Sequence, residues 1–333
     1  MIQIALFGAG VIGAVHAENV AANPDSTLAY VVDPQLARAQ SLAAKYGAAA
    51  LPQAEAALSD PDLDGVIIGS STSAHEDQLL ASIAAGKACL CEKPLADSLE
   101  AAVRCLKAAQ SAGVIAAVGF NRRLDRQYRE VFERVRAGEL GQVEMLHVAS
   151  RGNRAPAPET APLSGGMLRE KGTHFYDLVC WIANRDPVEV YTAGACRIDP
   201  GYAAYDDVDT AALTLRLTDD TLATFDFGRR TAFGQDELIE VFGAEGMLIS
   251  GRQRDGDVCL YAGKNTVGPG IHYSWHDRFA DSYIEELTRF VRAVKGDEAV
   301  HATLADAVRA QAVAEAAVIS HRENRPVRIE PIW

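Results

Sequence analysis

Basic residues are scarce in this sequence relative to acidic ones. Its 333 residues include 32 Lys and Arg against 45 Asp and Glu, which gives a formal net charge of −13. Because nucleic-acid binding usually requires a basic face, such a partner is disfavoured, and so is an anionic membrane surface. The charge does not exclude an anionic small molecule, since backbone N–H groups bind phosphate locally even in an acidic protein.

The sequence also has few cysteines and no long apolar run. No hydrophobic stretch reaches the ~20 residues needed to span a bilayer, and Met1 leads directly into a strand-like run without the features of a signal peptide. Of the six cysteines, only Cys89 and Cys91 lie close together, in a segment that alternates like a strand. A disulfide framework is therefore not expected. We predict a cytoplasmic protein whose thiols are buried or unreactive.

What is present is an ordinary globular composition, 48% hydrophobic and 23% charged. The length exceeds one typical core and suits two α/β domains. Over residues 1–120, continuous apolar runs alternate with helical segments, which is typical of a parallel sheet covered on both faces. The predicted strands are 2–7, 28–32, 65–69, 88–91 and 114–118. The predicted helices are 13–22, 35–46, 75–85 and 98–112.

After residue 120 the pattern changes from alternating strands and helices to mostly strands. Short hairpin signals separate several of these segments, so we predict a large, mostly antiparallel open sheet. The predicted strands are 143–150, 188–197, 210–217, 222–227, 238–242, 247–249 and 258–261, with a last edge strand at 325–329. The predicted helices are 125–137, 168–183, 279–295 and 304–322. The fold class is α/β: a doubly wound domain followed by an α+β domain.

The first predicted strand is followed by the pattern G-x-G-x-x-G, formed by Gly8, Gly10 and Gly13. The first glycine permits the tight turn, the second lets the backbone approach a pyrophosphate, and the third lets helix and strand pack closely. The intervening Val11 and Ile12 open the helix, where N–H groups and the helix dipole favour an anion. Strand, turn and helix together predict a Rossmann dinucleotide-binding domain over residues 1–120.

Asp33 stands at the end of the second predicted strand, 20 residues after Gly13. A carboxylate there accepts hydrogen bonds from ribose hydroxyls and repels a 2′-phosphate, and its neighbours Val32 and Pro34 include no Arg. NAD is therefore predicted in preference to NADP. The alternative is a glycine-rich turn that binds no ligand.

Glu92, Lys93 and Pro94 follow the fourth strand, at the edge of the sheet where ligands bind in this fold. A lone lysine after a strand is usually a solvated loop residue, but the flanking Pro94 and the preceding apolar strand favour a fixed position for Lys93. Together with the glycine pattern, Asp33 and a downstream Gly165-Gly166…His174…Asp177 segment, however, this sequence resembles the glucose–fructose oxidoreductase/inositol dehydrogenase (Gfo/Idh/MocA) superfamily. The segments Gly119 to Arg123, Ser150-Arg151 and Ile239 to Gly246 resemble its inositol 2-dehydrogenase branch. The similarity runs over nearly the whole chain.

The resemblance implies that Lys93 and His174 line the substrate site. Oxidation of a secondary alcohol needs a base for the hydroxyl proton, for which a neutral His174 is suited. The ammonium of Lys93 would stabilise alkoxide character on the same oxygen. Glu170, four residues before His174, would share its helix face, although the inositol branch usually has Asp there and Lys171 follows here. The alternative for His174 is a core histidine. Asp177 is expected to be either a structural cap or a helix partner of His174, with the structural role favoured.

Further candidates are weaker. Ser70, Ser71, Thr72 and His75 follow the third strand and are expected to contact the cofactor, against simple helix capping. Glu92 and Arg122 are expected to contact the cofactor, and Arg123 the substrate. Residues expected to form walls of the substrate pocket are Asn153, Tyr202, Tyr205 and Phe233, of which Asn153 and Phe233 would contact the substrate. The pair Arg122 and Arg123 could instead be solvated.

No metal site is predicted. His272 and His276 have a suitable spacing only if one helix carries both, and the acidic cluster at residues 206–209 has few hallmarks of a calcium loop.

We therefore predict an NAD-dependent dehydrogenase for a secondary hydroxyl of a cyclic polyol or sugar, of the inositol 2-dehydrogenase type. Three alternatives stay open: a related aldose dehydrogenase or keto-sugar reductase, a non-catalytic NAD-binding regulatory protein, and an enzyme that retains NAD and oxidises its substrate transiently. The resemblance also implies a homo-oligomer, dimer or tetramer, assembled through the C-terminal sheet. The C-terminal domain spans residues 121–333, and its last helix is expected to pack back on the first domain.

Overall fold

The computed structural model describes all residues from 1 to 333. The chain forms two compact units: unit 1 comprises Met1–Leu124, Asp281–Gln311 and Ile332–Trp333, and unit 2 comprises Asp125–Ala280 and Ala312–Pro331. Two long helices, α10 (Trp275–Lys295) and α11 (Leu304–Glu323), each contribute residues to both units. No helix has the length and apolarity needed to cross a membrane.

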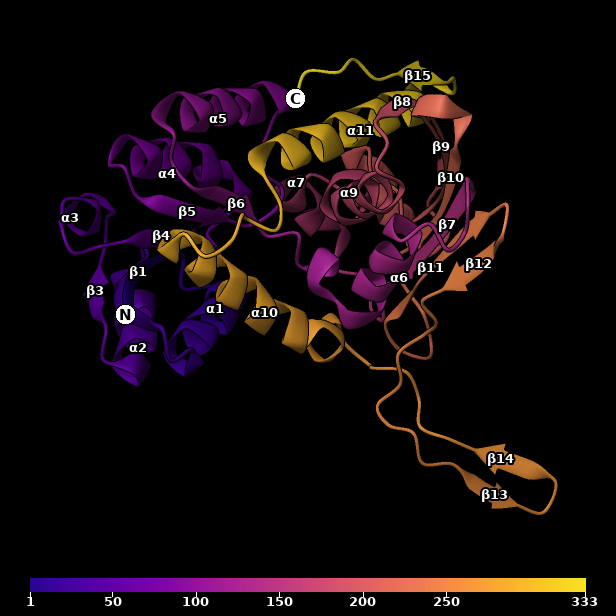
Figure 1. The fold of residues 1–333 in the computed structure, drawn as a ribbon, viewed down its shortest axis with the longest axis horizontal. Helices are drawn as coiled ribbons and strands as arrows, with labels where there is room; N and C mark the ends of the chain where they lie inside the picture. The colour runs from indigo at the N-terminus through magenta and orange to yellow at the C-terminus, as the bar shows by residue number, and fades with distance from the viewer. The chain divides into compact units, whose positions relative to one another are not determined.

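Unit 1 contains a six-stranded parallel sheet in the order β3-β2-β1-β4-β5-β6 (Figure 1). Its strands are β1 Ile2–Phe7, β2 Ser26–Val32, β3 Ala49–Leu51, β4 Gly65–Ile68, β5 Ala88–Cys91 and β6 Ala116–Val118. Its other helices are α1 Val11–Ala22, α2 Leu36–Tyr46, α3 Glu55–Leu58, α4 Thr72–Ala84 and α5 Leu99–Ala112. The strand order reverses between the central strands β1 and β4. In doubly wound sheets ligands bind at such a switch point, outside the carboxyl ends of the strands. The predicted fold class is confirmed.

The central strands form because their residues are apolar on both faces. All residues of β4 and β5 are buried, as expected for strands covered by helices on both sides. Helix α5 shows the local signals of its ends: Ser98 caps it by accepting from the N–H of Ala101 at 3.2 Å, and Gly113 ends it in the left-handed conformation. The sequence analysis missed β3 and α3, whose three and four residues are too short to show a period.

The core of unit 1 includes side chains from the far end of the sequence. Leu287, Phe290 and Val291 of α10 belong to the same buried cluster as Ile4 of β1 and Ile67 of β4. A Cβ at Gly65 would stand only 3.3 Å from the ring of Phe290, so helix and strand approach closely there. Burial of a Phe side chain stabilises a fold by roughly 1.5–3 kcal/mol, so this part of α10 is an integral layer of unit 1.

Unit 2 contains a seven-stranded sheet in the order β12-β11-β7-β10-β9-β8-β15. Its strands are β7 Val143–Arg151, β8 Pro187–Ala195, β9 Thr210–Leu217, β10 Leu222–Gly228, β11 Asp236–Gly243, β12 Gly246–Ile249 and β15 Val327–Arg328. Only β7 and β10 pair in parallel. The sheet is therefore mostly antiparallel, and the edge strand near residue 327 is confirmed.

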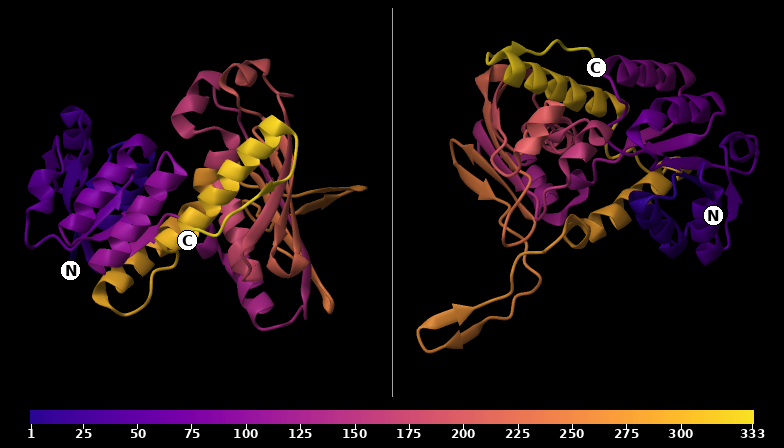
Figure 2. Two further views of the ribbon diagram at one scale, coloured as in Figure 1. Left: turned by 90° about the horizontal axis from the view of Figure 1, so that it is seen from above. Right: turned by 180° about the vertical axis from the view of Figure 1, so that it is seen from behind.

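One face of this sheet is covered by helices (Figure 2). The helices of unit 2 are α6 Arg126–Arg136, α7 Ala161–Ser164, α8 Met167–Glu170 and α9 Gly172–Ala183. Strand β9 alternates strictly between exposed and buried residues. On the buried face, Tyr176 of α9 meets Phe225 edge to face at 5.3 Å, and Trp181 stacks on Phe132 of α6 at 3.8 Å. This alternation places apolar side chains on one face of the sheet, and α9 packs on that face.

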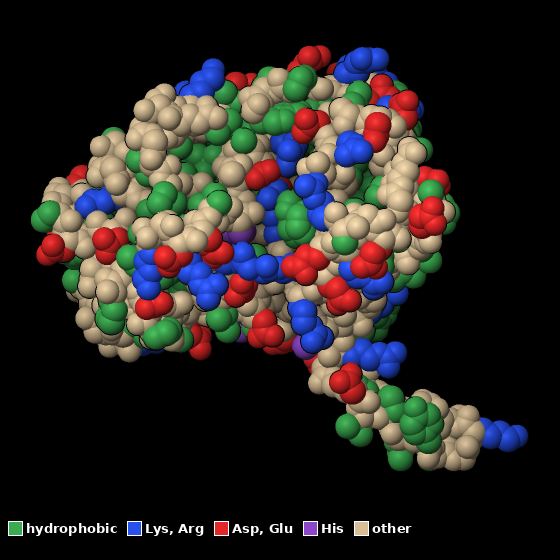
Figure 3. Space-filling view, in the orientation of Figure 1, with side chains coloured by type: hydrophobic (Ala, Val, Ile, Leu, Met, Phe, Trp, Pro, Cys, Tyr) green, Lys and Arg blue, Asp and Glu red, His purple; other side chains and the backbone are tan.

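The prediction of a sheet strand at residues 258–261 was wrong. These residues start a separate hairpin of β13 (Leu260–Ala262) and β14 (Asn265–Val267), which extends from unit 2 in Figures 1 and 2. Every residue of both strands is exposed, so no buried face holds them to the large sheet. Figure 3 shows hydrophobic side chains along this hairpin, and Val258 is 90% exposed.

None of the six cysteines forms a disulfide. Four of them are buried, and burial raises the pKa of Cys89 and of Cys105 to about 12. Because the thiolate is the reactive form, these buried thiols are inert at neutral pH.

Candidate functional site

The glycine turn after β1 is closely packed at Gly8 and Gly13 and open at Gly10. A Cβ at Gly8, whose φ is +99°, would stand 2.6 Å from the carbonyl oxygen of Gly69, and a Cβ at Gly13 would stand 2.0 Å from that of Gly8. At Gly10 an added Cβ would meet nothing within 4 Å. Gly8 and Gly13 are therefore required by packing, whereas Gly10 leaves room for a ligand beside the backbone.

Helix α1, which begins at Val11, is arranged to receive an anion. Its N-cap Gly10 supplies no side-chain hydrogen bond, and the first turn has no acidic residue. The first N–H groups of a helix have no partner within it, and the helix dipole adds positive potential there. The residues present therefore fit the pyrophosphate of a dinucleotide.

Asp33 is held in place at the end of β2. It is buried, and its two carboxylate oxygens accept hydrogen bonds from the N–H of Ala9 at 2.9 Å and of Gln35 at 2.8 Å. Each oxygen retains a lone pair for a ribose hydroxyl. The bond to Ala9 also fixes the carboxylate relative to the glycine turn.

The residues after β4 lie across the switch point from that turn. Ser71 is the N-cap of α4 but its side chain makes no capping hydrogen bond, while the hydroxyl of Ser70 donates to Gln78 at 2.7 Å. His75 is buried, with its ring nitrogens 2.8 Å from the carbonyl oxygen of Pro94 and 3.2 Å from that of Ser70. His75 thus links the loop after β4 to the loop after β5.

Glu92 and Lys93 directly follow β5. Glu92 is buried, and its Oε2 accepts the N–H of Lys93 at 3.2 Å. Its Oε1 lies 2.9 Å from Nε2 of His16 on α1. Lys93 is half-buried, so it is not a fully solvated loop lysine.

In unit 2, His174 lies in the first turn of α9 and is buried. The predicted single helix over residues 168–183 was wrong, because the structure has two successive helices, α8 and α9, that meet at Lys171. The hydroxyl of Thr173 donates to the carbonyl oxygen of Arg169 at 2.9 Å, a local contact that competes with the regular helical ladder. Glu170 is therefore the last residue of α8, and His174 is the third residue of α9.

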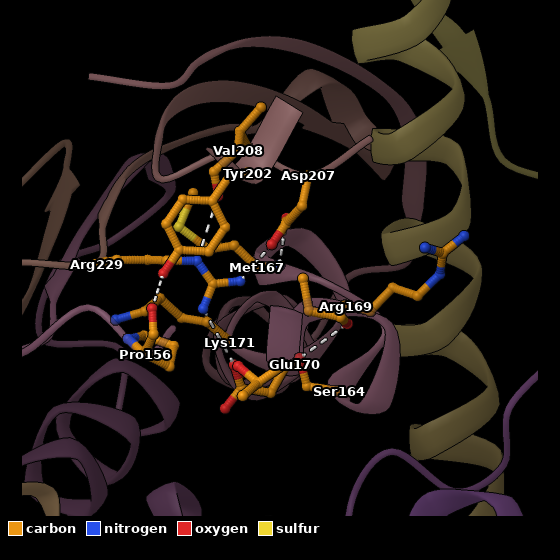
Figure 4. Close-up of polar contacts among 12 residues, drawn as sticks. Pro156, Ser164, Met167, Arg169, Glu170, Lys171, Tyr202, Asp207, Val208 and Arg229 are labelled. Carbon is orange, nitrogen blue, oxygen red and sulfur yellow. Dashed lines mark hydrogen bonds and ion pairs between the residues drawn. The ribbon is translucent and has the colours of Figure 1, made fainter. Parts of the chain in front are cut away.

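Glu170 stands beside a buried arginine that the sequence analysis missed. Figure 4 shows the guanidinium of Arg229 between Asp207 and Glu170, with the ring of Tyr202 alongside. Arg229 donates to Asp207 at 2.6 Å, and its Nη1 lies 3.8 Å from a carboxylate oxygen of Glu170. Asp207 also accepts the N–H of Met167 at 2.8 Å. The ion pair thus joins the strand end at Arg229 to the start of α8.

The remaining predicted residues have different surroundings. Tyr202 is fully buried, lies 4.9 Å from the Arg229 guanidinium and donates to the carbonyl oxygen of Pro156, so its assignment to a pocket wall was wrong. Phe233 is 57% exposed and Asn153 is half-buried. Tyr205 is exposed. Lys171, which follows Glu170, donates to the hydroxyl of Ser150 at 3.3 Å.

The alternative of a solvated arginine pair was also wrong. Arg122 and Arg123 are both buried in unit 1. Arg123 lies 3.1 Å from a carboxylate oxygen of Asp306 and donates to the carbonyl oxygen of His301. This partner is distant in the sequence, so the local pattern around the two arginines could not reveal it.

The two candidate metal groups have other arrangements. His276 is in α10 but His272 precedes that helix and lies 2.6 Å from Asp255, so no helix carries both histidines. In the acidic cluster, Asp207 pairs with Arg229, and Asp209 accepts three backbone N–H groups from residues 197–199. Asp209 is fully buried, which favours its neutral form, but these hydrogen bonds lower its pKa overall.

Two family models cover most of the chain. Residues 2–120 match the oxidoreductase family with an NAD-binding Rossmann fold, and residues 128–249 match the GFO/IDH/MocA C-terminal domain. The chain belongs to the Gfo/Idh/MocA oxidoreductase family. The resemblance inferred from the motifs is thereby confirmed, and NAD is the cofactor of the Rossmann domain that this family shares.

Relatives within the Gfo/Idh/MocA family are similar to the chain over almost its full length. It is 32% identical over 331 residues to myo-inositol 2-dehydrogenase of Thermotoga maritima, with 99% of each chain covered. It is 31% identical to inositol 2-dehydrogenase of Rhizobium meliloti, covering 98% of this chain and 99% of that one. The crystal structure of a probable dehydrogenase from Thermotoga maritima superposes with a TM-score of 0.96 at 32% identity, covering 100% of both chains.

The position of Asp33 makes cofactor choice testable. Asp33→Ser removes the charge that repels a 2′-phosphate, so the preference for NADH over NADPH in binding should fall at least about tenfold, which is about 1.4 kcal/mol. Fluorescence titration with each reduced cofactor measures this ratio independently of overall folding losses. The exposed Asp62→Ser variant, which changes net charge equally, should leave the ratio unaltered. An unaltered ratio in Asp33→Ser would show that Asp33 does not select the cofactor.

Proposed function

We propose that this chain is an NAD-dependent dehydrogenase that oxidises a secondary hydroxyl of a cyclic polyol or sugar, of the inositol 2-dehydrogenase type. The observation that carries the proposal is the match, over 98–99% of the chain, to relatives named as inositol 2-dehydrogenases. It is supported by the glycine turn, the open helix end at Val11 and the oriented carboxylate of Asp33.

In the proposed mechanism two side chains act on one hydroxyl oxygen. His174 takes the hydroxyl proton as general base, a role worth about 10²–10⁴-fold in rate when the base is well placed. The ammonium of Lys93 donates to the same oxygen and stabilises the negative charge that develops as the proton leaves. NAD held by the Rossmann domain would supply the acceptor for the hydride that leaves the alcohol carbon. The alcohol thus loses a hydride and a proton and becomes a ketone.

The remaining site residues are assigned by their positions. For the cofactor we assign Gly8, Gly10, Val11, Ile12, Gly13, Asp33, Ser70, Ser71, Thr72, His75, Glu92, Lys93 and Arg122. For the substrate we assign Lys93, Arg123, Asn153, Glu170, His174 and Phe233. Glu170 suits hydroxyl recognition, because its carboxylate is 42% exposed and lies 3.8 Å from the Arg229 guanidinium. Arg123, His75 and Glu92 would act mainly through the loops they hold.

We also propose the division of labour between the two parts of the chain. Residues 1–120 supply all of the cofactor contacts except Arg122, and residues 121–333 supply the substrate contacts other than Lys93 together with a homo-oligomer interface. The face of the unit 2 sheet that carries no helices supports an interface, since Met145, Phe242, Met247 and Ile249 on it are each at least 41% exposed. Exposed apolar patches of this kind commonly mark association surfaces.

A dehydrogenase screen tests the proposal. Purified protein should form NADH from NAD with at least one inositol isomer, and kcat/KM should be higher for that isomer than for aldoses. The second candidate, an aldose dehydrogenase or keto-sugar reductase, is favoured by the Glu170–Lys171 pair that differs from the inositol pattern, and it predicts the reverse ranking. No turnover with any inositol or aldose, in either direction, would defeat both.

A further inference from the structure

Beneath Lys93, unit 1 encloses a cluster of ionisable side chains from five parts of the sequence. His16 comes from α1, Glu92 from the end of β5, Glu286 from α10 and His301 from the segment before α11. The side chains of these four residues are each between 0% and 8% exposed. Arg122 and Tyr283 complete the charged and titratable surroundings. Because such groups are costly to bury without partners, the cluster needs an explanation.

Glu92 is the best-connected member of the cluster. Its Oε1 lies 2.9 Å from His16 Nε2, and its Oε2 accepts the N–H of Lys93 at 3.2 Å. A Cβ at Gly119, directly after β6, would stand 2.9 Å from Oε2, so the carboxylate is packed against that backbone. Glu92 therefore connects α1, the helix that follows the glycine turn, to the loop that carries Lys93.

Glu286 differs sharply from Glu92. Its side chain is fully buried, neither carboxylate oxygen has a hydrogen-bond partner, and its Oε1 lies 3.5 Å from His301 Nε2. Burial and the neighbouring charge of Glu92 raise the pKa of Glu286 well above its ordinary value. Burial also opposes ionisation of Glu92, but the hydrogen bond and charge of His16, with Lys93, lower its pKa overall.

Two carboxyl groups in one enclosed cluster rarely ionise together, because their repulsion is poorly screened there. Environments that separate the ionisation of neighbouring acids assign them different roles. The donor atoms of His16, Glu92 and Glu286 lie within 4.8 Å of one another, a spacing a cation could use. The charges of His16 and Arg122 favour ionisation of Glu286, but burial and the charge of Glu92 outweigh them. A proton on Glu286 therefore relieves the repulsion between the two carboxyl groups without a cation.

We propose that the buried His16–Glu92 pair positions Lys93, with Glu92 as the single carboxylate of the cluster and Glu286 as its neutral, protonated partner. His16 and Glu92 act through Lys93 rather than on the substrate, so both are positioning residues. The inference rests on the proposed function only for the role of Lys93. The charge assignment of the two glutamates stands on the contacts within unit 1.

The two glutamates provide a matched pair of variants. Glu92→Gln removes the charge that holds His16 and Lys93, and misplacement of a reacting group by ~1 Å costs about 10²-fold. We expect kcat to fall by about that factor while the Kd for NADH changes less than about threefold. Glu286→Gln resembles a protonated acid in shape and charge, so both quantities should stay close to wild type. Equal losses in both variants, or kcat unchanged in Glu92→Gln, would overturn the proposal.

A readout independent of turnover separates this proposal from the proposed function. Brief acetylation of the full-length protein, followed by peptide mass spectrometry, compares Lys93 with the exposed Lys45. The ratio of Lys93 to Lys45 labelling should change in Glu92→Gln and stay constant in Glu286→Gln. If wild type oxidises no polyol but this contrast appears, the proposed function fails and the positioning claim survives. A constant ratio in both variants, or one equivalent of tightly bound metal by elemental analysis, contradicts it.

Stability against pH tests the charge assignment. Because the pKa of Glu286 is raised, its stabilising contribution is complete below about 4.5, its ordinary value, and is lost as pH rises through the folded value. Glu286→Gln has no group that ionises at this position, so its stability does not fall in this way. The melting temperature of Glu286→Gln minus that of wild type should therefore increase as pH rises. Because the pKa of Glu92 is lowered, Glu92→Gln should be least stable relative to wild type at neutral pH and recover as pH falls. Parallel curves for both variants would refute the assignment.

Discussion

Lys93→Met should lower kcat/KM for polyol oxidation by about 10²–10³-fold, the loss expected when one preorganised donor to a developing oxyanion is removed. Met retains most of the apolar stem of Lys93, so packing is preserved while the ammonium is lost. Binding of NADH should change much less, since Lys93 is expected to act mainly at the reacting hydroxyl. Steady-state kinetics with the preferred polyol, together with NADH titration, measure both quantities.

The matched control for this experiment is Lys45→Met on the exposed surface of α2, which makes the same chemical change away from the sheet edge. It should leave kcat/KM within about twofold of wild type, as surface substitutions usually do. Activity of Lys93→Met within about threefold of wild type would remove Lys93 from the mechanism. The buried cluster beneath it would then need another role.

His174→Gln should lower kcat by about 10²–10⁴-fold, because an amide cannot take the hydroxyl proton. Gln keeps a polar side chain of similar length at the start of α9, so the surrounding packing is largely retained. The acid limb of the pH profile of kcat/KM should also disappear, since protonation of an imidazole base is what inactivates the wild type at low pH. Kinetics across pH measure both effects.

His147→Gln provides the comparison for that substitution. His147 is on β7 and its Nδ1 lies 2.9 Å from the hydroxyl of Thr224, away from the proposed site residues. This variant should keep the wild-type pH profile. A His174→Gln variant that retains both its rate and its acid limb would show that another group removes the proton.

The parts of the structure that sequence reasoning predicted are those with local causes. The apolar runs of β4 and β5 and the glycine spacing from Gly8 to Gly13 each specify their geometry within a few residues. The family's motifs are of this kind, which explains why the fold and the cofactor followed from them. The orientation of the Asp33 carboxylate also has a local cause, because the N–H of Gln35, two residues later, donates to one of its oxygens.

The parts that were missed have partners far away in the sequence. Arg229 pairs with Asp207, 22 positions away in the sequence, and Arg123 contacts Asp306, 183 positions away. The residues that neighbour each arginine in the sequence therefore do not show that it is buried. Glu286 lies in a strongly amphipathic helix whose pattern shows only that one face is buried. The boundary between α8 and α9 falls at Lys171, whose own backbone is helical, so no residue type in the sequence marks it.

The most direct measurement is a crystal structure of the protein with NAD and its preferred polyol. Convergence of Lys93 and His174 on one substrate oxygen predicts that the Lys93 Nζ and one imidazole nitrogen of His174 each lie about 2.6–3.2 Å from that oxygen. A complex in which either group contacts a different part of the polyol, or no part of it, would contradict the mechanism.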